Sequence, residues 1–284
     1  MRLLSLALAL FSVSLASASL AQAEPEPTPE NASVTPTSPP AETPPQFQAF
    51  SDTELQVLGM FGPARVPGDD IDKASEGAFI LTFQHFSTWE LGYNFFFLDV
   101  ESQPAWHFLD EKFGLYFEYA PTLSFNKLGL TDLPSDGIIN DLSLTLQLNL
   151  GYAVGGFEIN RVFLEGIVLN WGVPGAPVFE THLLARQEHN YGLTWQLTFA
   201  WLIPLPFGEF RGFMDIWQTR ENDNPGTEDK LVLLSQPQLI VELASHLYAG
   251  AELELRHDFP GKFAYDEGQS TWDFRVGPML LFNF

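Results

Sequence analysis

The chain has 284 residues, of which 13 are Lys or Arg and 36 are Asp or Glu, and its formal net charge is −23 at pH 7. This acidic balance argues against nucleic acid as a partner, because the phosphates would be repelled. Cysteine is absent, which excludes disulfides, thiolate metal sites and cysteine nucleophiles.

The first 46 residues divide into two segments that we expect to stay outside the folded core. Residues 1–23 combine Arg2, an apolar stretch and a final AQA, which is the pattern of a secretory signal peptide. Residues 24–46 are rich in Pro, Glu and Thr, so we expect a disordered periplasmic tether. No later apolar run reaches the roughly 20 residues that a transmembrane helix requires. The folded domain is therefore expected to span residues 47–284.

The rest of the chain alternates apolar and polar side chains with the period of two that is typical of β-strands. The clearest case is residues 141–150 (DLSLTLQLNL), where five leucines alternate with five polar residues. The pattern predicts an all-β fold of twelve strands, at residues 53–62, 77–88, 93–101, 115–124, 141–150, 157–171, 178–187, 191–201, 208–218, 230–243, 247–256 and 270–284.

The last of these segments indicates what kind of all-β fold to expect. Every second residue from Trp272 to Phe284 is apolar, while the positions between them include Asp273, Arg275 and Asn283. Such a final strand, in a chain that starts with a secretory signal, is typical of barrels in bacterial outer membranes. The 26 phenylalanines suit a lipid-facing wall. We therefore expect a single transmembrane antiparallel β-barrel of 12 strands, monomeric, in contact with outer-membrane lipid and lipopolysaccharide.

The lengths of the connections predict an orientation. An even number of strands returns both ends of a barrel to one side, so the tether and the C-terminus are expected to be periplasmic. Connections after odd-numbered strands should then be extracellular and longer, as are the acidic stretches 63–76, 102–112, 219–229 and 258–269. Three connections depart from this rule: residues 125–138 are long on the periplasmic side, and those near Gly155 and His189 are short.

No catalytic or metal-binding constellation stands out. The six histidines do not form a pair with metal-ligand spacing, so neither a metal nor a cofactor is expected. His85 and Ser87 would share one face of a strand, but the sequence specifies neither a third orienting residue nor oxyanion donors. We expect the protein not to be an enzyme.

The most unusual run is residues 89–101 (WELGYNFFFLDVE), which has aromatic residues on both faces of a strand. Tyr93, Phe95 and Phe97 share a face with Asp99 and Glu101, and charged residues avoid lipid, so this face is assigned to the barrel interior. Rings beside carboxylates could stack a flat heterocycle and hydrogen-bond its sugar. Alternatively, the phenylalanines pack against an inward-folded loop. The run alone leaves both interpretations open.

A family resemblance adds to this interpretation. Residues 83–89 (FQHFSTW), followed by 92–99 (GYNFFFLD), resemble the hairpin of the Tsx-type nucleoside-specific channels, in which a Trp, a Gly-Asp-Asn and a Phe run ending in Asp recur in this order. Three later stretches are similar as well, namely 124–128 (SFNKL), 193–196 (LTWQ) and 235–239 (SQPQL). The resemblance implies a monomeric twelve-stranded barrel with a narrow pore that passes nucleosides and deoxynucleosides. This chain departs from the family at Tyr93, where the family often has Asp.

Together these observations predict a lumen site and a function. Tyr93, Phe95 and Phe97 would form a stacking wall, Asp99 and Glu118 would accept hydrogen bonds from ribose hydroxyls, and the opposing charged side would consist of Arg256, Asp273 and Arg275. Alternatively, an ion-pair ladder that only sets the width of the pore would consist of Glu252, Glu254, Arg256, Asp273 and Arg275. The expected function is passive uptake of nucleosides. The alternatives are a general or differently specific small-solute porin, and a structural barrel with a filled lumen.

Overall fold

In a computed structural model, residues 1–46 and 47–284 form two separate units, and the second is the folded domain. The structure describes residues 50–62, 77–102, 113–152, 159–189, 192–219, 230–258 and 272–284. The predicted signal peptide (1–23) and tether (24–46) therefore lie outside the described residues. No helix in the described part of the chain is long and apolar enough to cross a membrane.

The described residues form thirteen strands. They are β1 (Ser51–Met60), β2 (Ala78–Trp89), β3 (Gly92–Ser102), β4 (Phe113–Ser124), β5 (Ile139–Tyr152), β6 (Ile159–Trp171), β7 (Val178–Glu188), β8 (Gly192–Leu205), β9 (Gly208–Thr219), β10 (Lys230–Ser235), β11 (Gln238–Ala244), β12 (Leu247–His257) and β13 (Trp272–Asn283).

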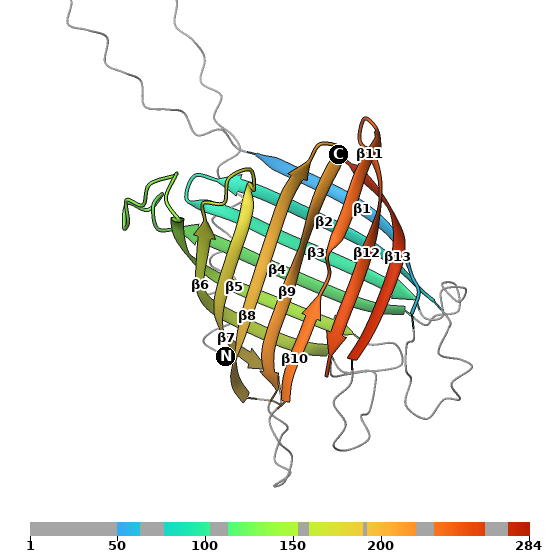
Figure 1. Cartoon of the computed structure of the whole chain (residues 1–284). Helices are drawn as coiled ribbons and strands as arrows, with labels where there is room; N and C mark the ends of the chain where they lie inside the picture. The colour runs from blue at the N-terminus through green and yellow to red at the C-terminus, as the bar shows by residue number, and fades with distance from the viewer. Residues whose placement is uncertain are drawn as a thin grey trace, which may run out of the picture. The chain divides into compact units, whose positions relative to one another are not determined.

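These strands form one closed antiparallel barrel, as the sequence predicts. Each strand pairs with its neighbours, and β1 pairs with β13 as well as with β2, so the sheet has no free edge. Figure 1 shows the inclined strands closing into this ring. β10 and β11 both lie between β9 and β12, so they share one position in the ring. The barrel therefore has the expected twelve strand positions.

The prediction of one continuous strand at residues 230–243 is wrong, because the structure has two strands there, β10 and β11. The break falls at Gln236 and Pro237, where proline cannot donate a hydrogen bond to the ladder. The backbone around the break still finds partners, since the N–H of Gln236 donates to the carbonyl of Phe213 at 3.0 Å and that of Leu253 donates to the carbonyl of Pro237 at 3.0 Å. The proline thus interrupts the strand without opening the wall.

The start of β1 and the end of β13 lie at the same rim of the barrel. We call it the turn rim, and the C label in Figure 1 lies at it. The N–H of Phe284 donates to the carbonyl of Thr53 at 2.9 Å, and that of Thr88 donates to the carbonyl of Phe50 at 2.8 Å. The connections at this rim are residues 90–91, 125–138, 172–177, 206–207 and 245–246. The connections at the opposite rim lie mostly outside the described residues.

The long connection 125–138 is ordered around one side chain. The Nδ2 group of Asn126 donates to the carbonyls of Leu133 (3.0 Å) and Asn140 (2.9 Å), and its Oδ1 atom accepts a hydrogen bond from the hydroxyl of Thr131 at 2.5 Å. The connection 125–138, which is longer than expected for the periplasmic side, is therefore held together by hydrogen bonds at the turn rim.

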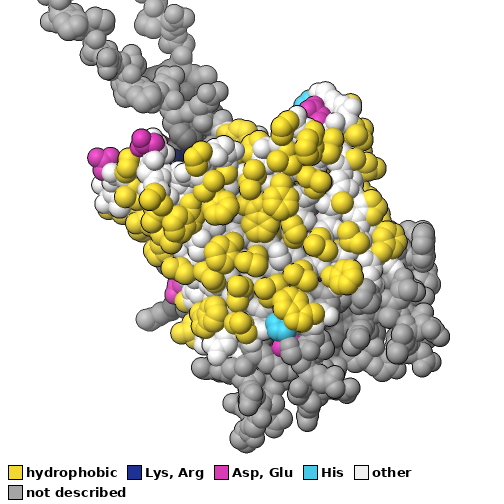
Figure 2. Space-filling view, in the orientation of Figure 1, with side chains coloured by type: hydrophobic (Ala, Val, Ile, Leu, Met, Phe, Trp, Pro, Cys, Tyr) yellow, Lys and Arg dark blue, Asp and Glu magenta, His cyan; other side chains and the backbone are white. Residues whose placement is uncertain are grey.

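The two faces of the wall have opposite character. Outward-facing side chains are large, apolar and solvent-exposed, for example Leu183 (53% exposed) and Phe274 (54%), and Figure 2 shows hydrophobic side chains covering much of one side of the barrel. Inward-facing polar side chains are buried, including Gln56, Thr145 and Asn149. This arrangement reverses that of a soluble protein and is typical of a wall that faces lipid.

Candidate functional site: the barrel lumen

Five aromatic rings line one side of the lumen along β2, β3 and β4. Alternation within β3 points Tyr93, Phe95 and Phe97 inward, as predicted, and Phe86 and Tyr116 join them from the neighbouring strands. The centroid distances are 5.4 Å for Phe86 and Tyr93, 6.0 Å for Phe95 and Phe97, and 5.7 Å for Phe97 and Tyr116. Tyr116 is 37% exposed and none of the others is fully buried. This aromatic wall is therefore accessible from the lumen.

Both predicted acceptors, Asp99 and Glu118, lie beside the aromatic wall. Asp99 accepts a hydrogen bond from the hydroxyl of Thr82 at 2.5 Å. Glu118 is opposite Phe97 in the ladder and accepts hydrogen bonds from the Tyr116 phenol and, at 2.7 Å, from the Nδ2 group of Asn149. The structure thus brings together the aromatic and acidic residues that the sequence proposed for this wall.

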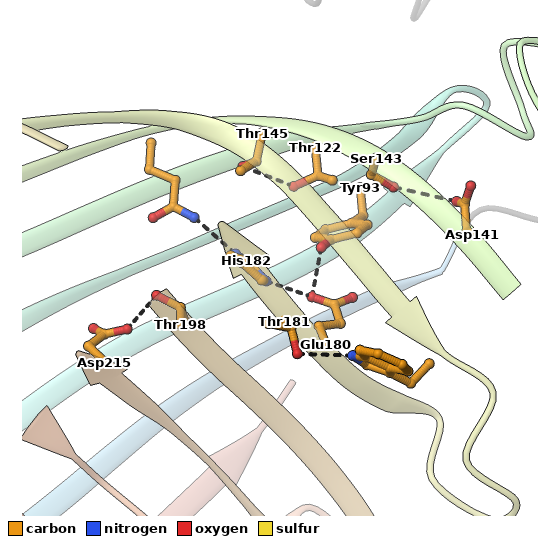
Figure 3. Close-up of polar contacts among 12 residues, drawn as sticks. Tyr93, Thr122, Asp141, Ser143, Thr145, Glu180, Thr181, His182, Thr198 and Asp215 are labelled. Carbon is orange, nitrogen blue, oxygen red and sulfur yellow. Dashed lines mark hydrogen bonds and ion pairs between the residues drawn. The ribbon is translucent and has the colours of Figure 1, made fainter. Parts of the chain in front are cut away.

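A third carboxylate, which the sequence reasoning missed, faces them from the other side of the barrel. Asp215 on β9 accepts a hydrogen bond from the hydroxyl of Thr198 at 2.5 Å (Figure 3), and it interacts electrostatically with Glu118 on β4. Arg186 on β7 also interacts with Glu118 and lies over the ring of Trp217, with 5.0 Å between its Cζ atom and the ring centroid. Three carboxyl groups therefore lie at this level of the lumen, with one guanidinium near them.

Tyr93 takes part in a hydrogen-bonded chain that crosses the lumen, which we call the Tyr93 bridge. Its phenol donates to Oε2 of Glu180 at 2.9 Å, and Nε2 of His182 lies 3.0 Å from the same oxygen. Nε2 of Gln147 lies 3.2 Å from Nδ1 of His182. Figure 3 shows Tyr93, Glu180 and His182 pointing toward one another from β3 and β7. Alternation over residues 178–187 places Glu180 and His182 on one face, but it does not identify Tyr93 as their partner.

A second bridge joins β9 to β1 near the turn rim. The guanidinium of Arg211 donates to both carboxylate oxygens of Glu54, at 2.7 and 2.6 Å, and lies 3.2 Å from Glu209. Its Nε atom donates to Oε1 of Gln238 at 2.9 Å. Arg211 and Glu54 are 8% and 4% exposed, so this ion pair is desolvated. The sequence analysis identified neither residue.

A third bridge contains two of the charged residues that were predicted to oppose the aromatic wall. Arg275 on β13 donates to Oε1 of Glu254 from Nε (2.8 Å), contacts it from Nη2 (2.7 Å), and reaches Glu101 on β3 at 3.3 Å. Arg256 also pairs with Glu254. Asp273 is the ladder partner of Arg256, but its side chain lies outside the described residues. Glu254, Arg256 and Arg275 thus form ion pairs, whereas Glu252, the fourth described member of the alternative ladder, accepts a hydrogen bond from Gln238 at 2.7 Å. Contact between any of these residues and a solute stays a prediction.

The lumen also has apolar parts that the sequence analysis did not predict. One buried cluster lies on the inner faces of β1, β2, β11 and β13 and consists of Leu58, Met60, Ala78, Ile80, Ile240, Met279 and Leu281. A smaller one on β6 and β7 consists of Val162, Leu164 and Leu184. Buried apolar side chains therefore occupy part of the lumen on strands that also carry bridge residues, such as Glu54 on β1 and Arg275 on β13.

The histidine and serine considered as a possible hydrolase pair lie on the outer face of β2. The Nδ1 atom of His85 lies 2.8 Å from the hydroxyl of Thr53, and its ring stacks on Phe96 with 5.2 Å between centroids. In the described part of the chain, no group of three or more His, Asp or Glu side chains could hold a metal ion.

Comparisons with known proteins find similarity in structure only. No protein-family model matches the chain, and no curated protein matches it either. The translocator domain of the autotransporter NalP from Neisseria meningitidis is similar with a TM-score of 0.39 and 10% identity, over 82% of this chain and 88% of that one. A bacterial polysaccharide outer membrane secretin has a TM-score of 0.34 and 9% identity, over 82% and 98%. A mutant of the Rh. blastica porin has a TM-score of 0.31 and 9% identity, over 84% and 100%.

These scores are too low to indicate a shared topology, and a shared architecture does not by itself imply a function. Function must therefore be argued from the lumen and the outer wall of this chain. The resemblance of residues 83–99 to the Tsx-type channels stays a prediction.

Proposed function

We propose that the chain is an integral barrel of a bacterial outer membrane that lets small solutes diffuse through a narrow, acidic, aromatic-lined lumen, with nucleosides as the leading solute class. The membrane location rests on the outer wall, whose exposed side chains are apolar over the strands, and on the secretory signal expected at residues 1–23. Both ends of the barrel share the turn rim, which we assign to the periplasm. We further propose that the barrel works as a monomer.

The observation that carries the proposed solute class is the aromatic wall beside carboxylates in the accessible part of the lumen. Phe95, Phe97 and Tyr116 offer ring faces to a flat heterocycle, and Asp99 and Glu118 lie next to them as acceptors for hydroxyl groups. Stacking on one ring contributes roughly 1–3 kcal/mol in proteins that bind single-stranded nucleic acid. An interaction of that size can select a solute and still release it, as passage through a channel requires.

The acidic surroundings refine the expected selectivity. The chain has 36 Asp and Glu residues against 13 Lys and Arg residues. This excess of acidic residues favours neutral and cationic solutes over anions. We therefore expect nucleosides to pass more readily than nucleotides, whose phosphates would be repelled.

A second candidate, a barrel with a filled lumen, is favoured by the three bridges. The Tyr93 bridge, the Arg211–Glu54 pair and the Arg275 contacts each join strands that are not neighbours, and the ionic groups of Arg211, Glu54 and Arg275 are buried. Such links would block a wide pore. A general small-solute porin is the third candidate, and the narrowing of the lumen makes it less favoured.

Planar-bilayer recordings of the purified, folded chain separate the three candidates. A small single-channel current that adenosine or thymidine reduces, and glucose does not, supports the nucleoside channel. A current that all three solutes leave unchanged, together with equal uptake of sugars by proteoliposomes, would indicate a general pore. Complete absence of current from protein that has inserted would indicate a filled barrel.

A further inference from the structure

A hollow on the outer wall of the barrel is not explained by a transport function. It has a volume of about 410 Å³ and lies across β5, β6, β7 and β8 near the rim opposite the turn rim, lined by Leu148, Arg161, Val162, Phe163, Gln187, Glu188, His189 and Gly192. Leu148 and Phe163 are 38% and 42% exposed on the outward face, and they form an apolar floor. Polar side chains with hydrogen-bond donors surround this floor on the side of the rim.

Arg161 gives the hollow its charge. It shares the outward face of β6 with Phe163, while Val162 between them is buried on the inward face. Of the strand Lys and Arg side chains that the structure describes, Arg161 alone points outward. The others point into the lumen and are Arg186, Arg211, Arg256 and Arg275.

Arg161 has no carboxylate partner among the described residues. Its Nη2 atom lies 3.5 Å from Nε2 of His189, a neighbour that supplies no negative charge. Glu188, which also lines the hollow, is paired with Arg186 at 2.9 Å. Glu165 shares the outward face but lies four residues further along β6, roughly 13 Å away at about 3.3 Å per residue. Among the residues that the structure describes, the guanidinium is therefore an exposed cation without a carboxylate partner, at the edge of an apolar wall.

The environment of such a cation determines which partner suits it. A charge on a lipid-facing wall is costly unless it reaches the interface or meets an opposite charge. The net charge of −23 repels anions from most of the surface. An anion can therefore bind only where a cationic side chain such as Arg161 is close to it. The apolar floor would in turn contact acyl chains. A molecule with an anionic group and acyl chains could therefore contact both Arg161 and the apolar floor.

We propose that this hollow binds the phosphate-bearing headgroup of an anionic membrane lipid. Arg161 and His189 contact the phosphate, Gln187 donates a further hydrogen bond from its amide, and the acyl chains lie along Phe163 and the exposed side chain of Leu193 on β8. This inference rests on the membrane insertion that is part of the proposed function, but it does not depend on which solute passes through the lumen.

The test uses the full chain, folded and then reconstituted into nanodiscs of phosphatidylcholine with a minor fraction of phosphatidylglycerol. Insertion is checked first by the shift in gel mobility on boiling, so that failure to insert is recognised separately and overturns the membrane location itself. The measured quantity is the enrichment of phosphatidylglycerol retained by the protein after mild detergent extraction, determined by mass spectrometry.

The wild-type chain is expected to enrich phosphatidylglycerol, and Arg161→Gln to lower this enrichment about fivefold, which corresponds to the roughly 1 kcal/mol that one basic residue contributes at an anionic membrane surface. His189→Ala should lower it less. The matched control is Lys127→Gln, which removes the same charge from a turn at the other rim and should leave the enrichment unchanged. Equal enrichment in Arg161→Gln and wild type would overturn the proposal. Displacement of the lipid by millimolar inorganic phosphate would also overturn it, because the site would then recognise free phosphate.

Discussion

The phenolic oxygen of Tyr93 lies 2.9 Å from Oε2 of Glu180, so that a single hydrogen bond joins β3 to β7 across the lumen. Nε2 of His182 lies 3.0 Å from the same carboxylate oxygen. The carboxylate of Glu180 is therefore contacted by both Tyr93 and His182. The resemblance of residues 83–99 to the Tsx-type channels, which often have Asp at the position of Tyr93, stays a prediction. A carboxylate there would face Glu180 and repel it, whereas a phenol can donate a hydrogen bond. Tyr93 and Glu180 are thus a matched pair in this chain.

Removing this hydroxyl is expected to loosen the lumen at that level. Tyr93→Phe keeps the ring but loses the donor, so the free energy of unfolding should fall by about 1 kcal/mol, and the single-channel current should rise because the two walls are no longer tied. Tyr119→Phe is the matched control, since that phenol bonds Asn94 on the outer face at 3.2 Å and should leave the current unchanged. A lower current in Tyr93→Phe would contradict the bridge as a constriction.

Shortening one ring of the aromatic wall tests whether it binds solute. Phe95→Ala is expected to weaken the block of current by adenosine about tenfold, the 1.4 kcal/mol step, because a stacking face is lost, while the open-channel current stays the same or increases. Phe96→Ala removes a ring from the outward face of the same strand, where it packs on Phe83 and Phe117, and should not alter the block. If adenosine blocks the current of Phe95→Ala as strongly as that of the wild type, the aromatic wall packs the lumen and does not bind the solute.

The Arg211–Glu54 pair is expected to behave as a structural bridge. Arg211→Gln leaves the buried carboxylate of Glu54 without its cation, which typically costs about 3–5 kcal/mol, so the heat-modifiable fraction and the urea midpoint should both drop. The double variant Arg211→Gln with Glu54→Gln removes the unpaired charge and should recover a large part of this loss. If the double variant is no more stable than Arg211→Gln, the charge of Glu54 is not the cause of the instability.

The last residue offers a test of the outer wall. Phe284 is 73% exposed and its backbone N–H bonds the carbonyl of Thr53, so Phe284→Asp keeps the backbone bond and places a charge where an apolar side chain meets the membrane edge. Assembly should be impaired, with less heat-modifiable protein in the outer-membrane fraction of cells. Phe284→Leu is the control, because it keeps an apolar side chain at the same exposed position and should assemble like the wild type. Wild-type assembly of Phe284→Asp would argue against a lipid-facing C-terminal strand.

The sequence predicted the strands well because alternation is a local property. A strand with one apolar and one polar face shows its period of two within ten residues, as in 141–150, and the same parity assigns Tyr93, Phe95 and Phe97 to the lumen. The break in the strand at residues 230–243 was missed because the apolar pattern continues on both sides of Pro237. Its missing N–H could have indicated the break.

The partners across the lumen were not predictable in the same way. Arg211, Glu54, Glu180 and Asp215 could each be assigned to an inward face from parity, yet no local pattern relates one strand to another that is several positions away in the ring. The sequence left open whether Arg256 and Arg275 oppose the aromatic wall or join an ion-pair ladder, and in the structure both pair with Glu254. Which charges meet depends on the tilt and stagger of the closed barrel.

The sequence by itself determined the class of fold, the number of strand positions and the face of each strand that turns inward, because these follow from the chemistry of side chains at alternate positions. Only the tertiary structure decided which inward residues form bridges, where the lumen is narrowed, and that Arg161 on the outer wall has no carboxylate beside it among the described residues. The physical reason is that closure of the ring brings together residues far apart in the chain, such as Glu54 and Arg211, through strand tilt and register that no single strand encodes.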